Sequence, residues 1–431
     1  MTASEMFCSF LGNLTVSNSD TISLRYGEIT STLNQSFRDT DSKTYKSLQV
    51  GSYGRNTAID GISDLDMAYI MPRSKWQTYN VAGGQRKLLR DVQTSIRERY
   101  PRTESKVDGQ VVTLSFVDFQ IEVLPVFEDD DGDFTYPDEN NGGSWKLTKP
   151  RAEMAEFAKS NQEKNTNLVD LGRMARAWKN KAGLQIGGLL IDTLAYRFLE
   201  STADYDQTAE SKHGHMMRDF FGFLSDEPEK AFYRAPGSNQ EVYIKKPFQK
   251  RAKEALTLCE EAIAAEGQKN CNNKWRKVFG RSFPPQPKEE SAQFSEHTFT
   301  DTEQHIFDKF PVDIRYTLAI DCEVKQDGFQ THRLLEMLAK KWLLQRNKAL
   351  RFSVLECNVP TPYRLMWKVL NRGPEAERRD NIRGQIVDDL GHQQKSETTS
   401  FRGDHLVECY AIKEGVVVAR DRIHVPIQPD A

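Results

Sequence analysis

Apolar and polar residues alternate along two stretches in the first third of the chain. Apolar side chains recur at every second position from Leu65 to Met71, and a similar alternation runs from residue 111 to residue 127. A period of two is typical of a β-strand with one buried face. The pattern predicts strands at 64–71 and 111–127, preceded by a short strand at 46–50.

Helical spacing predicts the elements around these strands. The pattern at residues 3–38 predicts a helix, a loop and a second helix with an approximate apolar stripe, and both helices are expected to cover the sheet. That stripe comprises Ile22, Leu24, Ile29 and Leu33. Further helices are predicted at 168–178 and 249–267. Beyond residue 300, short strands separated by turn residues such as Lys413-Glu414-Gly415 favour a β-sandwich.

The polar face of the strand at 64–71 carries two aspartates, Asp64 and Asp66. Residues two apart on a strand point the same way, with Cα atoms about 6.6 Å apart. That spacing suits carboxylates that share divalent ions about 3.5 to 4 Å from each other. A solvated face is the ordinary explanation of Asp-x-Asp on a strand. However, two buried carboxylates at this distance repel by about 3 kcal/mol at an effective dielectric near 20, so a buried pair favours a bound cation.

Two further features strengthen the metal hypothesis. Gly51-Ser52 precedes the aspartates, and a glycine turn lets backbone amides approach phosphate closely. Glu122, in the stretch 111–127, is placed to supply a third carboxylate from a neighbouring strand. Asp118 lies on the same predicted face and is the alternative third ligand. Three carboxylates suit Mg²⁺, which prefers oxygen ligands and retains positions for water and substrate phosphates.

The motifs GSYGRNTAI, SDLDM and EVLP together resemble those of the DNA polymerase β type nucleotidyltransferases, and in detail those of the bacterial cGAS/DncV-like nucleotidyltransferases (CD-NTases, the SMODS group). Further segments match that family in order along the chain, although its third acidic residue is more often Asp than Glu. They are YPDENNGGSW at 136–145, LTKPRAE at 147–153, DLGRMARAWKNK at 170–181 and KWRKVFGRSFP at 274–284.

The resemblance implies a catalytic role for Asp64, Asp66 and Glu122, which would hold two Mg²⁺ ions, with Mn²⁺ as the alternative metal. It also implies that the basic residue two positions before Trp178, which is Arg176, faces the γ-phosphate of the donor nucleotide. The family activity is synthesis of a cyclic di- or trinucleotide second messenger from NTPs, ATP or GTP or both, in antiphage defence, read by a downstream effector. The nucleotide-binding residues expected here are Gly51, Ser52, Arg55, Thr57, Arg176 and Lys179.

Segments 363–387 and 401–427 resemble the AGS-C domain, a module found beside such nucleotidyltransferases and proposed to sense a ligand or protein. The expected fold class is therefore α+β: a polymerase β-like nucleotidyltransferase core with a helical lobe, then a β-sandwich-like C-terminal domain. A segment rich in Pro, Ser, Gln and Glu separates them. The predicted division is a catalytic region at 1–290, a linker at 291–300 and an AGS-C-like domain at 301–431.

Charge and cysteine spacing limit the function classes. The net charge is -3, so a basic surface for constitutive DNA binding is not expected. The six cysteines form no C-x-x-C pair, which disfavours a zinc finger and fits reduced thiols. The N-terminus shows neither a signal peptide nor a long apolar run, so a cytoplasmic protein without membrane contact is expected.

The same residues are compatible with other functions. The same site could attach nucleotides to a protein, a tRNA or a small molecule, or make a linear oligonucleotide. A chain kept as a non-catalytic binding or scaffold protein is the alternative from a different class, although the intact acidic residues disfavour it. The sequence does not define the bases, ring size or linkage of a product.

Overall fold

The computed structural model describes residues 2–17, 19–61, 64–117, 119–207, 209–286, 304, 306–325, 330–342, 344–371, 378, 383–399 and 403–427. The chain divides into two compact units, Met1–Glu289 and Glu290–Ala431. The predicted linker at 291–300 lies outside the described residues, as does Asp118.

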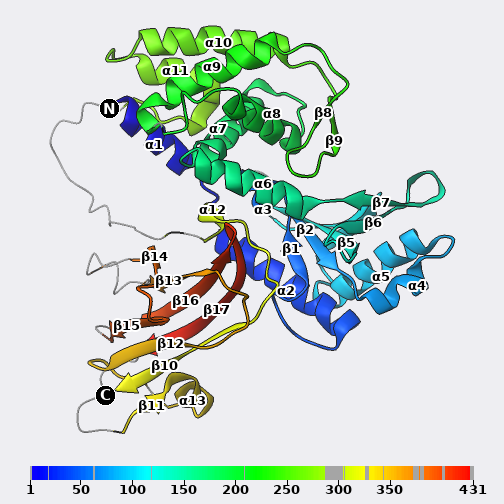
Figure 1. The fold of residues 1–431 in the computed structure, drawn as a ribbon, viewed down its shortest axis with the longest axis vertical. Helices are drawn as coiled ribbons and strands as arrows, with labels where there is room; N and C mark the ends of the chain where they lie inside the picture. The colour runs from blue at the N-terminus through cyan, green and yellow to red at the C-terminus, as the bar shows by residue number, and fades with distance from the viewer. Residues whose placement is uncertain are drawn as a thin grey trace. The chain divides into compact units, whose positions relative to one another are not determined.

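The first unit is built on a mixed sheet with the strand order β1-β2-β5-β4-β3, to which β6 and β7 are added beyond the end of β5 (Figure 1). β2 and β5 are parallel neighbours, whereas the other pairs are antiparallel. The strands are β1 (Ser47–Gln49), β2 (Asp64–Ile70), β3 (Glu104–Asp108), β4 (Val111–Ser115), β5 (Gln120–Glu128), β6 (Phe134–Asp138) and β7 (Ser144–Thr148).

The stretch predicted as one strand at 111–127 is a hairpin, and this prediction was wrong. β4 and β5 pair antiparallel with Val112 opposite Val123, and the backbone N–H of Phe116 donates to the carbonyl of Phe119 at 2.9 Å in the connection. Apolar alternation continues on both sides of this turn, so periodicity alone does not reveal it. Glu122 nevertheless keeps the predicted face, because it lies on β5 itself.

One face of the sheet is covered by two helices, α2 (Ser19–Arg38) and α5 (Gly84–Arg99) (Figure 1). Leu65, Met67 and Tyr69 of β2 pack there with Ile29 and Leu33 of α2. Leu24, which was predicted to belong to the same stripe, is instead 52% exposed. The covering helix leaves the opposite face of β2, with Asp64 and Asp66, for the site.

The remaining helices of this unit pack around a second core in which Phe7 of α1 contacts Trp275 of α11, with ring centroids 5.1 Å apart. α1 was expected to cover the sheet, but its buried side chains join this helical core. The helices are α1 (Ala3–Leu14), α6 (Pro150–Glu163), α7 (Asn167–Ala182), α8 (Gly188–Glu200), α9 (His213–Asp226), α10 (Gln249–Ala264) and α11 (Cys271–Phe279). Shorter elements are α3 (Gly51–Gly54), α4 (Trp76–Tyr79) and the hairpin β8 (Phe232–Arg234) and β9 (Glu241–Tyr243).

The second unit is a β-sandwich of two antiparallel sheets, ordered β11-β10-β12-β15 and β14-β13-β16-β17. Phe352 of one sheet and Trp367 of the other belong to a single buried cluster. The predicted turn at Lys413-Glu414-Gly415 joins β16 to β17, with positive φ at Glu414 and Gly415. The elements are α12 (Ile306–Lys309), β10 (Leu318–Lys325), β11 (His332–Arg333), α13 (Leu334–Ala339), β12 (Ala349–Cys357), β13 (Arg364–Leu370), β14 (Ile386–Asp388), β15 (Gln394–Thr398), β16 (Gly403–Lys413) and β17 (Val416–Ile427). The predicted fold class is confirmed.

None of the helices among the described residues is long and apolar enough to cross a membrane.

Candidate active site

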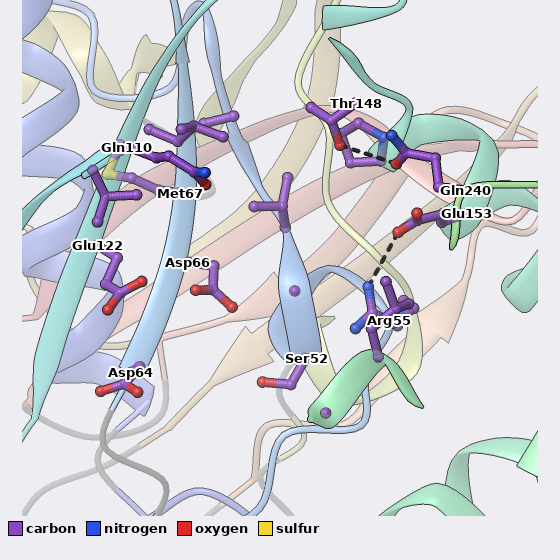
Figure 2. Close-up of a pocket in the computed structure, with 18 of the residues that line it drawn as sticks. Ser52, Arg55, Asp64, Asp66, Met67, Gln110, Glu122, Thr148, Glu153 and Gln240 are labelled. Atoms are coloured by element: carbon purple, nitrogen blue, oxygen red, sulfur yellow. Dashed lines mark hydrogen bonds and ion pairs between the residues drawn. The ribbon is translucent and has the colours of Figure 1, made fainter. Parts of the chain in front are cut away.

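A pocket of about 700 Å³ lies on the open face of β2 and β5. The turn around Gly51 and Ser52, the start of α6, the last turns of α7 and the start of α8 supply its other walls. Figure 2 shows Asp64, Asp66 and Glu122 side by side in this pocket, on two neighbouring strands.

Strand register brings the three carboxylates together. β2 and β5 are parallel with Asp66 directly opposite Glu122, and Asp64 lies two residues earlier on the same face of β2. The sequence predicted this grouping from alternation. The register that aligns Asp66 with Glu122 is visible only in the structure.

The electrostatics of the site match a cation-binding role. Burial, followed by the charge of Glu122, raises the pKa of Asp66 to about 7, with Asp64 adding to the shift and Arg55 opposing it. Burial and then the charge of Asp64 also raise the pKa of Glu122. Adjacent carboxylates disfavour each other's ionised form, and a divalent cation between them would reverse that effect.

These residues fit Mg²⁺ by the chemistry of their oxygen donors. In the described part of the chain, no group of three or more His, Cys, Asp or Glu side chains is arranged so that it could hold a metal ion by itself, and this includes Asp64, Asp66 and Glu122. A cation held by Asp64, Asp66 and Glu122 would therefore take its remaining ligands from water and substrate phosphate, which is the usual coordination of Mg²⁺.

The turn beside the carboxylates requires glycine. Gly51 has φ +63, and a Cβ on it would lie 1.8 Å from Oδ2 of Asp66. The backbone N–H of Val50 also donates to the carbonyl of Asp66 at 3.0 Å. Gly51 and Ser52 line the pocket next to Asp66. Backbone and hydroxyl donors are thus available beside the carboxylates, as the phosphate-cradle hypothesis requires.

Arg55 and Arg176 line the same pocket but are strongly buried, and both contact Asp192 of α8. The Nε–H of Arg55 donates to Oδ2 of Asp192 at 2.8 Å, and Nη2 of Arg176 donates to the same oxygen at 2.6 Å. A contact of Arg176 with the γ-phosphate stays a prediction, because the structure shows its protein partners alone.

Thr57 does not lie in the pocket wall, in contrast to its predicted contact with the donor nucleotide. Its side chain is fully buried, and its hydroxyl donates to Asp192 at 3.0 Å. The sequence placed Thr57 by its match to the family turn. Because Thr57 is buried and is not among the residues that line the pocket, its contact with the donor nucleotide stays a prediction.

Lys179 is half-buried at the end of α7 and faces the pocket. Burial, followed by repulsion from Arg176, lowers the pKa of its ammonium group, while Asp64 opposes the shift. No salt bridge of Lys179 with another described residue is formed. Lys179 is therefore the best-placed cation for an incoming phosphate.

The pocket is also lined by polar residues that the sequence analysis did not single out, namely Gln110, Thr148, Glu153 and Gln240 (Figure 2). Glu153 is buried, accepts a hydrogen bond from the hydroxyl of Ser238 at 2.8 Å and lies 3.6 Å from Nη1 of Arg55. The β8–β9 connection supplies Ser238 and Gln240 from about 90 positions downstream of the motifs. Glu153 lies within the LTKPRAE match, which was the available signal for it.

Comparison with known proteins agrees with these observations. Residues 1–161 match the model of the Second Messenger Oligonucleotide or Dinucleotide Synthetase (SMODS) domain, and residues 300–428 match that of the Adenylyl/Guanylyl and SMODS C-terminal sensor (AGS-C) domain. A "Probable cyclic nucleotide synthase" of Bacillus cereus (strain VD146) is 23% identical over 273 residues, which cover 54% of this chain and 81% of the relative.

Solved structures show the same fold. CdnC of E. coli MS115-1 with ATP matches with a TM-score of 0.50 and 16% identity, over 65% of this chain and 98% of CdnC. CdnC in its complex with HORMA-deltaN matches with a TM-score of 0.51 and 15% identity, over the same shares of the two chains.

The SMODS match contains the Gly51-Ser52 turn and all three carboxylates, while Arg176 and Lys179 follow it. The AGS-C match covers the β-sandwich. The chain is a nucleotidyltransferase, and it belongs to the cGAS/DncV-like nucleotidyltransferases (CD-NTases) of the SMODS group that carry a C-terminal AGS-C domain.

Proposed function

We propose that this nucleotidyltransferase joins NTPs into a cyclic di- or trinucleotide second messenger in a reaction that depends on Mg²⁺ or Mn²⁺. The observation that carries the proposal is the alignment of Asp66 with Glu122 across β2 and β5, beside the Gly51-Ser52 turn. A phosphate cradle and three carboxylates in one pocket are the parts that nucleotidyl transfer needs.

The roles of the residues follow from their positions. Asp64, Asp66 and Glu122 would hold two divalent ions, which would supply activation of the acceptor hydroxyl and neutralisation of the leaving pyrophosphate. Backbone amides near Gly51 and the hydroxyl of Ser52 bind the β- and γ-phosphates of the donor. Lys179, Arg55 and Arg176 add positive charge to the wall of the same pocket. The pocket orients the acceptor hydroxyl in line with the α-phosphate, so that its oxygen replaces pyrophosphate.

The relatives suggest the substrates and partners. CdnC was solved with ATP and also with a HORMA protein, and the Bacillus cereus relative is described as a cyclic nucleotide synthase. ATP, with GTP as an additional substrate, is accordingly the first nucleotide to test. The product would act on an effector in antiphage signalling in the cytoplasm, and residues 301–431 would form the sensor domain for a ligand or protein.

The runner-up function uses the same pocket to nucleotidylate a protein, tRNA or small molecule. The two are separated by incubating the purified full-length chain with all four NTPs and Mg²⁺ or Mn²⁺, then identifying products by mass spectrometry. A cyclic oligonucleotide of two or three units supports the proposal. A nucleotide attached to the protein, to added tRNA or to a small molecule supports the runner-up, whereas a linear oligonucleotide supports the separate alternative of a linear synthase. NTP consumption equal to that of the Asp66→Asn variant would instead support the scaffold alternative.

A further inference from the structure

Asp192 is the centre of a buried polar cluster behind the pocket. Its side chain is fully buried, and its Oδ2 accepts three hydrogen bonds, from Arg55 at 2.8 Å, Arg176 at 2.6 Å and Thr57 at 3.0 Å. The three donors come from the segment after α3 and from α7, whereas Asp192 belongs to α8. One carboxylate oxygen thus joins three segments that are distant in sequence.

Both arginines of the cluster have part of their surface in the pocket wall. In the described part of the chain, all hydrogen bonds of the Arg176 guanidinium leave from Nη2, toward Asp192, Thr57 and the carbonyl of Gly188. Arg55 uses Nε for Asp192, and its Nη1 lies 3.6 Å from Glu153. Because a guanidinium carries five N–H donors, each arginine retains donors beyond those that Asp192 occupies.

The packing around Arg176 leaves little freedom for its guanidinium. A Cβ on Gly188 would lie 2.6 Å from Nη1 of Arg176, and a Cβ on Gly172 would lie 2.9 Å from Cγ2 of Thr57. Glycine at these two positions lets α7, α8 and the segment after α3 approach closely. The orientation of Arg176 therefore depends on contacts made by Asp192 and on space left by Gly188.

We propose that Asp192 is a positioning residue, which holds Arg55 and Arg176 in the orientation that meets the triphosphate of the donor nucleotide. This inference rests on the proposed function for the identity of the ligand. The alternative is that the cluster is a purely structural ion pair, which would contribute to folding alone. If Asp192 positions the arginines, its loss should weaken binding of ligands that carry β- and γ-phosphates more than binding of ligands that lack them. A purely structural ion pair predicts equal losses for both kinds of ligand.

The test compares ATP with AMP as ligands of the full-length protein in Mg²⁺, using isothermal titration calorimetry. Asp192→Asn keeps the size of the side chain but removes the charge that aligns two buried cations. We expect affinity for ATP to fall by about tenfold to a hundredfold, as for the loss of charge-assisted hydrogen bonds, and affinity for AMP to change by less than about threefold. The ATP-to-AMP preference should fall accordingly.

Asp219→Asn is the matched control. Asp219 of α9 also accepts hydrogen bonds from an arginine and a hydroxyl, those of Arg218 and Tyr205, and it does not line the pocket. It should lower thermal stability while leaving the ATP-to-AMP preference unchanged. A second variant, Gly188→Ala, displaces the Arg176 guanidinium without any change of charge, and it should reduce the preference even if Asp192→Asn does not fold.

A double-mutant cycle tests whether Asp192 acts through Arg176. If it does, Asp192→Asn should weaken ATP binding less in the Arg176→Met background than in the wild-type chain, and the loss that remains there is the part that acts through Arg55. Independent, multiplicative effects would overturn the inference, as would equal losses for ATP and AMP in both Asp192→Asn and Gly188→Ala. If the wild-type chain prefers ATP through Asp192 but makes no cyclic product, the inference stands and the proposed product is wrong.

Discussion

Gly51 and Asp66 are packed so closely that no side chain fits between them. A Cβ on Gly51 would lie 1.8 Å from the carboxylate oxygen Oδ2 of Asp66, and the φ of Gly51 is +63. The Gly51-Ser52 turn and strand β2 are therefore in direct contact. Only glycine, which has no Cβ, permits this close approach at position 51.

The first prediction is that Gly51→Ala abolishes nucleotide transfer. The alanine must either move Asp66 or shift the turn, and a displacement of about 1 Å in an active site costs about a hundredfold in rate. A positive φ adds about 1 to 2 kcal/mol of backbone strain. Gly83→Ala is the matched control, because Gly83 has φ +74 with open space around it. Product formation by both variants should be compared at a temperature where both are folded; equal activity would refute the steric argument.

The second prediction concerns the charge of Asp66. Its pKa is raised in the folded chain, mainly by burial and then by Glu122, so ionisation destabilises the metal-free fold as pH rises from about 4 to 7. Asp66→Asn carries no charge and should raise the free energy of unfolding in EDTA at pH 7.5 by about 1 kcal/mol or more. The same substitution should abolish product formation.

Thermal denaturation with and without Mg²⁺ and ATP checks this. The ligands should raise the melting temperature of the wild-type chain and have little effect on Asp66→Asn. A variant that is less stable than wild type in EDTA would contradict the repulsion argument, and wild-type turnover would remove Asp66 from the metal site. Asp64→Asn should likewise lose activity while it stays folded.

The third prediction distinguishes two candidates for the third metal ligand. Glu122 faces Asp66 across the parallel strands, whereas Asp118 lies outside the described residues. We expect Glu122→Gln to reduce product formation as strongly as Asp66→Asn, by about a thousandfold, since several kcal/mol of metal-based stabilisation is lost at 1.36 kcal/mol per tenfold. Asp118→Asn should have a mild effect. The reverse ranking in steady-state assays would assign the ligand to Asp118.

Local periodicity predicted two of the elements that carry the site, β2 and α7. The alternation around Asp64 and Asp66 specified their common face, and the helical spacing at 168–178 predicted α7 with Arg176 and Lys179. The parallel pairing of β2 with β5 is a contact between segments about 56 positions apart, which no local pattern encodes. The hairpin at 116–119 was missed because alternation is the same on both sides of a turn.

The hydrogen-bond partners of buried polar side chains could not be predicted from the sequence, for a different reason. The polar groups of Thr57 and Arg176 could form hydrogen bonds with a ligand or with another side chain. Which partner they take depends on where Asp192 lies in the folded chain. Gln240 enters the pocket from the β8–β9 connection, so only tertiary structure relates it to Thr148.

The last prediction is that the catalytic region folds without the C-terminal domain. All the residues assigned to the pocket belong to the unit Met1–Glu289, whose sheet and helical cores are complete within it. A fragment ending near Ser291 should therefore be monodisperse, unfold cooperatively and bind ATP with Mg²⁺ within about threefold of the full chain, because no binding contact is removed. Residues 301–431 alone should bind neither ATP nor Mg²⁺. If the fragment is insoluble and recovers only when the C-terminal piece is added in trans, the two units share one core, and the proposed division into catalytic and sensor domains is wrong.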